Sequence, residues 1–164
     1  MSLRSVKAAL GASAPDLEVL ELERSTATVD LAAEALGVLP GQIAKTLSLY
    51  VGDDVIILVT RGDARLDNRK YKERFGTKAR MVKADEVEGR TGHPVGGVTP
   101  FGLAHPLQVY CDVSIREFME VFPAGGAPNA AIRIAPERLA ELTQAEWVDV
   151  VQRPLRPDVI GTNR

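Results

Sequence analysis

The sequence predicts one α+β domain in which helices flank a mixed β-sheet or partial barrel. The chain has 164 residues, a length that suits one domain with one core. Apolar residues make up 45% and charged residues 26%, which is an ordinary globular balance. The predicted strands outnumber the predicted helices, and the two alternate irregularly rather than as repeated βαβ units.

The first part of the chain predicts a helix, a strand and a second helix. Residues 2–10 place apolar side chains on one helical face, and LEVLEL (17–22) alternates as a strand does. STATVDLAAEALG (25–37) predicts a helix with Thr28 as its N-cap and Gly37 as its C-terminal stop.

The middle of the chain predicts the centre of the sheet. Residues 39–51 turn at a Pro-Gly pair and continue as a strand. VIILVT (55–60) is the most apolar segment, and such a run predicts a strand buried on both faces. RGDARLD (61–67) predicts a loop, NRKYKERFG (68–76) a short basic helix, and ARMV (79–82) a further strand.

The following segments predict alternating helices and strands. ADEVEGRTG (84–92) predicts a helix that runs into a turn, and LQVYCDV (107–113) predicts a strand. REFMEVF (116–122) predicts a helix or turn, and AAIRIA (130–135) a strand. PERLAELT (136–143) predicts a helix, because its proline suits the first helical position.

EWVDVV (146–151) predicts the last strand, so we expect one domain over residues 1–152 and a C-terminal tail over 153–164.

No apolar run approaches the roughly 20 residues of a membrane helix, and the N-terminus lacks the apolar stretch of a signal peptide. The single cysteine, Cys111, excludes an internal disulfide, and we expect it to be a buried strand residue rather than a nucleophile. A cytoplasmic location is therefore expected.

The stretch TGHPVGGVTPFGL (91–103) is the first candidate site. Gly96 and Gly97 can adopt backbone angles that are closed to other residues, and they let a ligand approach closely. Successive backbone N–H groups there could form an anion-binding concavity or an oxyanion hole. The alternative is a tight, buried turn, and the spacing matches no nucleotide-phosphate motif.

Lys45 is the second candidate. It lies in QIAKTLSL, and period-two alternation places it on the same side of the strand as Leu47 and Leu49. A lysine on a core face is costly unless it has a partner or lines a cleft. It could also be an exposed residue at the start of the strand.

A basic segment runs from Arg61 to Lys83. It holds nine basic and three acidic residues, so its net charge is +6, whereas the chain as a whole is −2. Such a run predicts either a solvated helix face or a phosphate-binding patch on an acidic body.

The remaining chemistry is sparse. No Cys/His cluster has metal-ligand spacing, no Ser/His/Asp arrangement can be identified, and no cofactor is expected. If the protein is an enzyme, its mechanism would depend on positioning, backbone donors and water.

The chain resembles the YbaK/prolyl-tRNA-synthetase-associated domain family. Five motifs carry the resemblance, in order: TATVDLAAEALGV, GQIAKTLSLYV, VIILVTRGDARLDNRKYKERFG, GGVTPFGL and IAPERLAELT. They extend over about residues 15–151. The resemblance implies a curved, barrel-like mixed sheet and a trans-acting hydrolase that cleaves the ester of mischarged tRNA. Typical family substrates are tRNA(Pro) carrying cysteine or alanine, and a prolyl-tRNA synthetase is a further possible partner.

The resemblance also implies site residues. Lys45 would hold the substrate's terminal ribose–phosphate or aminoacyl end, and amides near Gly97 and Thr99 would stabilise the oxyanion. The other implied substrate-binding residues lie in two glycine turns. Gly96, Val98, Pro100 and Gly102 belong to the first glycine turn, and Gly125 and Gly126 belong to the second. The candidate tRNA contacts are Arg61, Arg65, Arg69, Lys70 and Lys72.

The chain departs from the family pattern at two positions. Ala131 stands where some relatives carry an acidic residue, and Pro123 stands where cysteine-clearing relatives often have serine. Both departures put the identity of the amino acid in doubt. His93 is either a pocket residue of this subgroup or a capped loop histidine. The competing functions are a non-catalytic tRNA- or synthetase-binding module and an enzyme or binder for small molecules.

Overall fold

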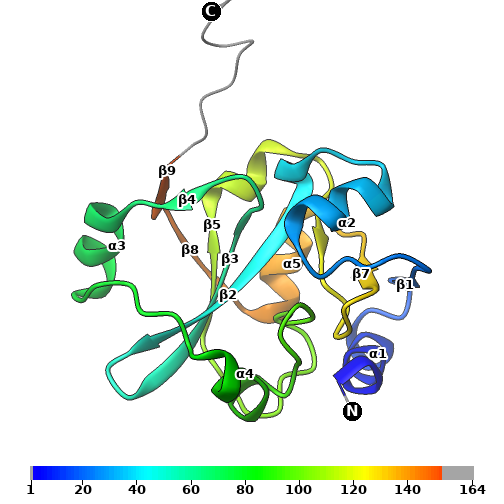
Figure 1. The fold of residues 1–164 in the computed structure, drawn as a ribbon, viewed down its shortest axis with the longest axis horizontal. Helices are drawn as coiled ribbons and strands as arrows, with labels where there is room; N and C mark the ends of the chain where they lie inside the picture. Colours follow the sequence, from blue (N-terminus) through cyan, green and yellow to red (C-terminus); the bar gives the residue numbers. More distant parts are fainter. Residues whose placement is uncertain (1, 153–164) are drawn as a thin grey trace, which may run out of the picture.

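The computed structural model describes residues 2–152, which fold around one five-stranded mixed sheet (Figure 1). The predicted tail 153–164 lies outside the described residues. The strand order across the sheet is β6 (Phe122–Pro123), β2 (Ile43–Val51), β3 (Asp54–Arg61), β5 (Val109–Asp112) and β8 (Glu146–Val148). Strands β2 and β3 are antiparallel, and the other three pairings are parallel. The sheet is curled, so the predicted α+β fold is confirmed.

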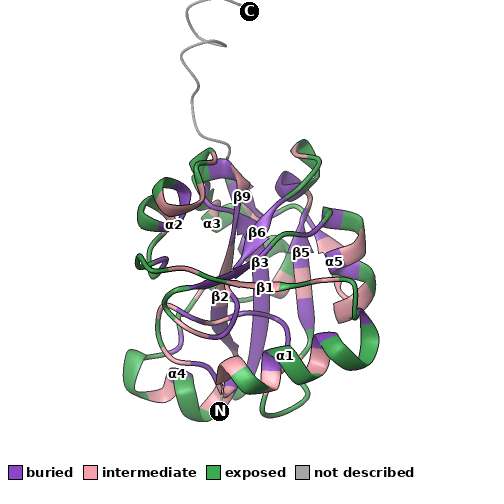
Figure 2. Ribbon diagram, turned by 90° about the vertical axis from the view of Figure 1, so that its right-hand side faces the viewer, coloured by how far each residue is buried: buried purple, intermediate pink, exposed green. Residues whose placement is uncertain are grey.

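Five α-helices surround this sheet within the described residues 2–152. They are α1 (Ser2–Ser13), α2 (Val29–Leu36), α3 (Asn68–Phe75), α4 (Ala84–Thr91) and α5 (Pro136–Thr143). Two 3-10 turns, η1 (Pro40–Gln42) and η2 (Val113–Glu117), complete the helical segments. Buried residues concentrate on the central strands, and exposed residues lie on the outer helical surfaces (Figure 2).

The two faces of the sheet bury different clusters. One face packs Ile57 and Val59 of β3 against Val6 of α1 and Leu139 of α5. The other face buries Leu49 and Leu58 against Tyr71 of α3. Strand β3 is therefore buried on both sides, as its apolar sequence predicts.

Two short ribbons lie beside the main sheet. Strand β1 (Val19–Glu21) pairs with β7 (Ala130–Ile132), and β4 (Arg65–Leu66) pairs with β9 (Val151–Gln152). An isolated bridge between Ala124 and Ala131 brings β7 beside the second glycine turn.

Local signals predicted the helix ends correctly. The Thr28 side chain accepts a hydrogen bond from the Leu31 amide, and Gly37 is left-handed at the end of α2. Gly76 ends α3 in the same way.

Several strand predictions were wrong because strand pairing depends on distant partners. The predicted loop 61–67 contains β4, which exists through its pairing with β9. The predicted strand 79–82 makes only an isolated bridge, between Met81 and Leu49. The predicted strand 146–151 divides into β8 and β9, which join different sheets.

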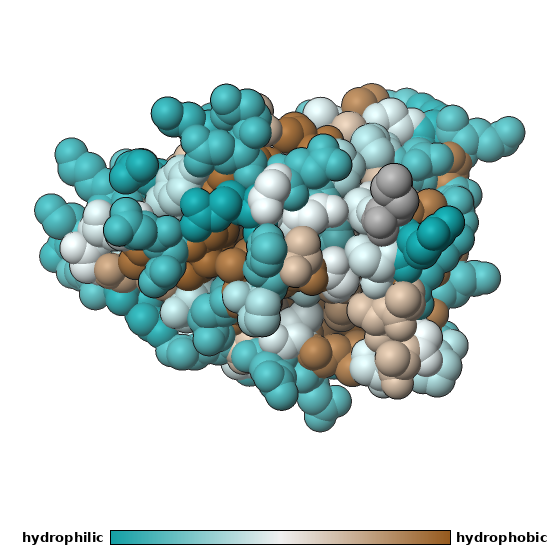
Figure 3. All heavy atoms as spheres, turned by 90° about the horizontal axis from the view of Figure 1, so that it is seen from below, coloured by the Kyte–Doolittle hydropathy of each residue, from teal (hydrophilic) through white to brown (hydrophobic). Residues whose placement is uncertain are grey.

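The surface on the side of α4 is mainly hydrophilic, with hydrophobic atoms visible between the polar side chains (Figure 3). Among residues 2–152, no helix has the length and hydropathy needed to cross a bilayer.

Candidate functional site: a cavity beside strand β2

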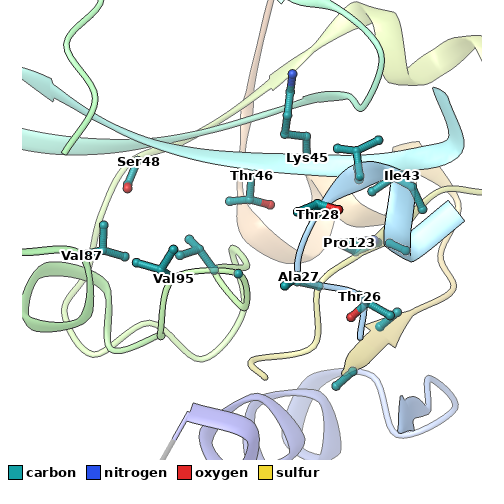
Figure 4. A pocket seen from close by; sticks show the side chains of 18 of the residues that line it. Thr26, Ala27, Thr28, Ile43, Lys45, Thr46, Ser48, Val87, Val95 and Pro123 are labelled. Atoms are coloured by element: carbon teal, nitrogen blue, oxygen red, sulfur yellow. The ribbon is translucent and has the colours of Figure 1, made fainter. Parts of the chain in front are cut away.

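A cavity of about 300 Å³ lies between β2, the start of α2, the first glycine turn and the segment around β6 (Figure 4). Its wall is mainly apolar, and the apolar side chains come from Ile43, Val82, Val87, Val95, Val98 and Phe122. Polar side chains enter it from Thr26 and Thr28 before α2 and from Thr46 and Ser48 on β2. The cavity size and composition suit a small organic group held by a few polar contacts.

One edge of β2 has a gap beside this cavity. Strand β6 pairs with Ile43 and Ala44. Farther along, the Tyr50 amide donates to the Arg80 carbonyl, and the Ser48 carbonyl accepts from the Val82 amide. Between these pairings, residues 45–47 have no described strand on that edge.

The first glycine turn forms part of the cavity wall. Gly96 has φ +87°, and a Cβ there would lie 3.0 Å from the Ala27 Cβ. Gly96 and Val98 line the cavity, and their predicted substrate-binding role stays a prediction. Thr99 and Pro100 are buried, and neither is among the lining residues.

The amide of Gly97 does not fit its predicted role as an oxyanion donor. It donates to the Pro94 carbonyl at 2.9 Å, so this N–H group is already used inside the turn. A Cβ at Gly97 would lie 2.9 Å from the Ala127 backbone nitrogen. Gly97 therefore permits close packing of the two glycine turns. By contrast, the Val98 amide makes no hydrogen bond to another described residue.

The second glycine turn packs between the first glycine turn and helix α1. Gly125 donates to the Ala130 carbonyl at 2.8 Å. Gly126 has φ +97°, and a Cβ there would lie 2.8 Å from Val6 of α1. Neither glycine lines the cavity, and Gly102 packs against Ser5 of α1 instead. These three glycines, predicted to bind substrate, thus pack against other segments of the domain rather than along this cavity.

His93 is not a pocket residue. Its side chain is fully buried, and its Nε2 lies 2.8 Å from the Phe101 carbonyl oxygen. Its Nδ1 lies 2.5 Å from the Ser2 hydroxyl oxygen, which also lies 2.5 Å from the Gly126 carbonyl oxygen. Burial lowers the pKa of His93, although the hydrogen bond to Phe101 acts against this. The imidazole therefore connects α1 with the first glycine turn, and the Ser2 hydroxyl connects α1 with the second.

Lys45 lies on the side of β2 that carries Leu47 and Leu49, as alternation predicted. Its ammonium points away from Thr46 and Ser48 (Figure 4) and donates to the Ala64 carbonyl at 2.7 Å. Burial lowers the Lys45 pKa, whereas the charge of Asp63 raises it. The lysine contributes to the cavity wall, but its ammonium lies outside the cavity.

Arg61 is not a surface residue of the basic segment. Its side chain is 6% exposed and pairs with Asp63 and Glu117, each at 2.5 Å. The hydrogen bond to Asp63 raises the Arg61 pKa despite burial. These contacts give Arg61 a structural role, because its charge is neutralised within the domain.

The other predicted tRNA contacts lie on or near α3. Arg65, Arg69 and Lys72 are exposed. Lys70 is half-buried and donates to Asp149 and to the Val151 carbonyl, both at 3.2 Å. Three of the five predicted basic residues are therefore exposed, and of these Arg69 makes an ion pair with Glu73 at 3.6 Å.

Cys111 is fully buried in β5, which confirms its predicted place. Burial raises the pKa of its thiol to about 12, so it is not a ready nucleophile.

The sequence prediction missed the polar side chains of the cavity. Thr46 and Ser48 lie two residues apart on β2, so they share the face opposite Leu47 and Leu49. This alternation was present in the sequence, but the prediction considered only Lys45 on that strand. Thr26 could not be found in this way, because it lies in an irregular segment.

The chain belongs to the aminoacyl-tRNA editing domain family, whose model matches residues 23–142. The predicted family resemblance is thus confirmed. Uncharacterized protein YwhH of Bacillus subtilis (strain 168) is 48% identical over 152 residues, which cover 92% of this chain and 97% of that protein. An Enterococcus faecalis protein named as a candidate Cys-tRNA(Pro)/Cys-tRNA(Cys) deacylase is 27% identical and covers 74% of this chain and 75% of its own.

The similarity extends to a larger enzyme and to solved structures. The proline–tRNA ligase of Shouchella clausii is 31% identical over 99% of this chain, which spans 30% of the ligase. A crystal structure described as a candidate trans-editing enzyme for prolyl-tRNA synthetase superimposes with a TM-score of 0.85 at 36% identity, covering 93% of this chain and 98% of that one.

Proposed function

We propose that the protein is a trans-acting deacylase that hydrolyses the ester of mischarged tRNA, with tRNA(Pro) carrying a small non-cognate amino acid as the first substrate to test. The main support is the cavity beside β2, which is small, largely apolar and bordered by the first glycine turn. The names of relatives in the family point to cysteine on tRNA(Pro) as one such substrate.

In this proposal the cavity receives the aminoacyl group, and the Val98 amide donates to the ester carbonyl oxygen. Water attacks the carbonyl carbon, and the resulting negative charge on oxygen is stabilised by the backbone donor. The ester bond then breaks, and the ribose oxygen leaves with the proton that the attacking water gives up. The products are a free amino acid and an uncharged tRNA.

Lys45 has a binding role in this proposal. A lysine ammonium has three donors, and the Lys45 ammonium uses one on the Ala64 carbonyl. It lies beside β2 at the edge gap, where a ribose–phosphate outside the cavity could reach it. Exposed Arg65, Arg69 and Lys72 would contact further phosphates.

The alternative is a tRNA- or synthetase-binding module without chemistry. The observation that favours it is the Lys45 ammonium, which points out of the cavity in this structure. Release of amino acid from tRNA separates the two functions.

The test is release of labelled amino acid from tRNA(Pro) carrying alanine, cysteine or serine, with prolyl-tRNA(Pro) as the cognate control. We expect hydrolysis of at least one mischarged tRNA and little of the cognate one. Lys45→Ala should lose most of this activity, whereas Lys7→Ala, which removes an exposed lysine of α1, should keep it. Binding of tRNA without release from any member would support the binding module instead.

A further inference from the structure

The cavity face of β2 is polar where a core face would be apolar. Thr46 and Ser48 point into the cavity (Figure 4), and in the register of the sheet they stand opposite Val59 and Ile57. Both of those β3 residues are fully buried in the apolar core. Two neighbouring hydroxyls on this face therefore need an explanation other than packing.

Three of the four hydroxyl side chains that line the cavity, those of Thr26, Thr46 and Ser48, have no partner among the described residues, whereas the Thr28 hydroxyl caps α2. The Thr46 Oγ1 and Thr26 Oγ1 atoms are buried, and neither makes a hydrogen bond within residues 2–152. Ser48 is 4% exposed, and its hydroxyl has no hydrogen bond to another described residue. A buried hydroxyl without a partner is unfavourable, so a bound group that supplies a partner would be stabilised there.

The cavity also discriminates by charge. Among the described residues that line it, no carboxylate is present, and the only cationic side chain is that of Lys45, whose ammonium points away. An aminoacyl side chain with a full charge would lose hydration without gaining a partner. Val87 and Val95 lie beside Ser48 (Figure 4), and with a cavity volume of about 300 Å³ this favours a small side chain there.

We propose that Thr46 and Ser48 determine specificity, so that the cavity binds aminoacyl groups whose side chains are small, uncharged and carry a hydroxyl, namely seryl and threonyl groups, in preference to those with apolar side chains of the same shape. This inference rests on the proposed function in taking an aminoacyl ester as the ligand. A site that hydrogen-bonds a substrate hydroxyl rejects the analogue that lacks it, because the site's polar groups then stay unpaired.

The test uses ligands that cannot be hydrolysed, so that binding is measured apart from catalysis. The probes are 3′-aminoacylamino-3′-deoxyadenosines, in which an amide replaces the ester. Two pairs have matched shapes: serine with 2-aminobutyrate, and threonine with valine. By titration calorimetry we expect the hydroxyl member of each pair to bind about tenfold more tightly, which is the effect of one hydrogen bond.

Variants of Thr46 assign this preference to a residue. Thr46→Val keeps the shape and removes the hydroxyl, so the serine preference should fall by about threefold or more. Thr46→Ser keeps the hydroxyl and should retain the preference. Because Thr46 Oγ1 has no partner, Thr46→Val should fold, and thermal unfolding checks this. Ser48→Ala is the second variant, and it should also reduce the preference.

The outcomes are distinct. Equal binding of serine and 2-aminobutyrate analogues by the wild-type protein would overturn the inference, as would an unchanged preference in folded Thr46→Val and Ser48→Ala proteins. A serine preference that depends on Thr46, without hydrolysis of any mischarged tRNA in the panel, would uphold this selectivity and refute the proposed deacylase. Absence of binding by every analogue would overturn both.

Discussion

Gly97 is held between two segments that are far apart in the sequence. Its amide is used by Pro94, and the space for a Cβ is occupied by the Ala127 backbone. The residue is therefore required for the two glycine turns to approach each other. This explains why a glycine stands at a position whose own N–H group is unavailable to a ligand.

Gly97→Ala should consequently displace one turn. We expect the free energy of unfolding to fall by about 1–3 kcal/mol and ester hydrolysis to fall with it. Gly11→Ala is the matched control, because a Cβ there would contact nothing within 4 Å. In a helix this control should stabilise by up to about 1 kcal/mol. Urea unfolding measures the stability of both variants. Equal midpoints for the two would contradict the packing role of Gly97.

Lys45 should separate function from stability. Burial lowers its pKa, so the folded state disfavours the charged ammonium. Lys45→Met should therefore leave the urea midpoint at pH 7 unchanged or higher, while turnover is lost. A clear decrease in the midpoint would show that the hydrogen bond to Ala64 stabilises the fold more than desolvation opposes it.

At the level of elements, α1 is the part of the domain that holds the glycine turns together. It lies outside residues 23–142, which match the family model. Ser2 reaches the Gly126 carbonyl, Ser5 reaches the Gly102 carbonyl, and His93 bonds to Ser2 and Phe101. Helix α1 should therefore be needed for activity as well as for stability.

The buried imidazole gives this arrangement a pH dependence. Because burial lowers the pKa of His93 below 6.5, the unfolded chain binds its proton more tightly than the folded protein does. Stability then falls as the pH decreases through about 6.5. His93→Gln should show a smaller loss of stability between pH 7 and pH 5 than the wild type. The exposed His105 provides the control, since His105→Gln should retain the wild-type slope.

Elements with local signals could be predicted from the sequence. Thr28, Gly37 and Gly76 mark helix ends through their own chemistry, and the alternation in β2 gave the correct side for Lys45. The division of 146–151 could not be predicted, because its two halves pair with different strands. The place of His93 depends on Ser2, 91 residues away. Sequence patterns do not specify such contacts.

For the whole molecule, charge is distributed unevenly. The segment 61–83 carries a net charge of +6 and the chain as a whole −2, although burial of Arg61 removes one base from the accessible set. Because the rest of the chain is acidic, electrostatic forces should orient the protein with its basic surface toward a polyanion. The location in the cytoplasm and the tRNA contacts themselves stay predictions.

The salt dependence of tRNA binding tests this surface. If Arg65, Arg69 and Lys72 each neutralise one phosphate, each alanine variant should reduce the slope of log affinity against log salt by about one. Lys7→Ala should leave the slope unchanged, because Lys7 pairs with Glu21 on another part of the surface. The slope is measured by filter binding between about 50 and 200 mM salt, the range in which such slopes are determined. Unchanged slopes in all three variants would place the tRNA elsewhere.

The gap along β2 has a consequence for the behaviour of the protein in concentrated solution. Unpaired strand edges can recruit other chains into extended sheets. Here β6 and residues 80–82 close the edge on both sides of residues 45–47. The remaining opening is much shorter than the usual strand of about five or six residues. The domain can thus keep backbone groups accessible beside its cavity while offering too little edge for self-association.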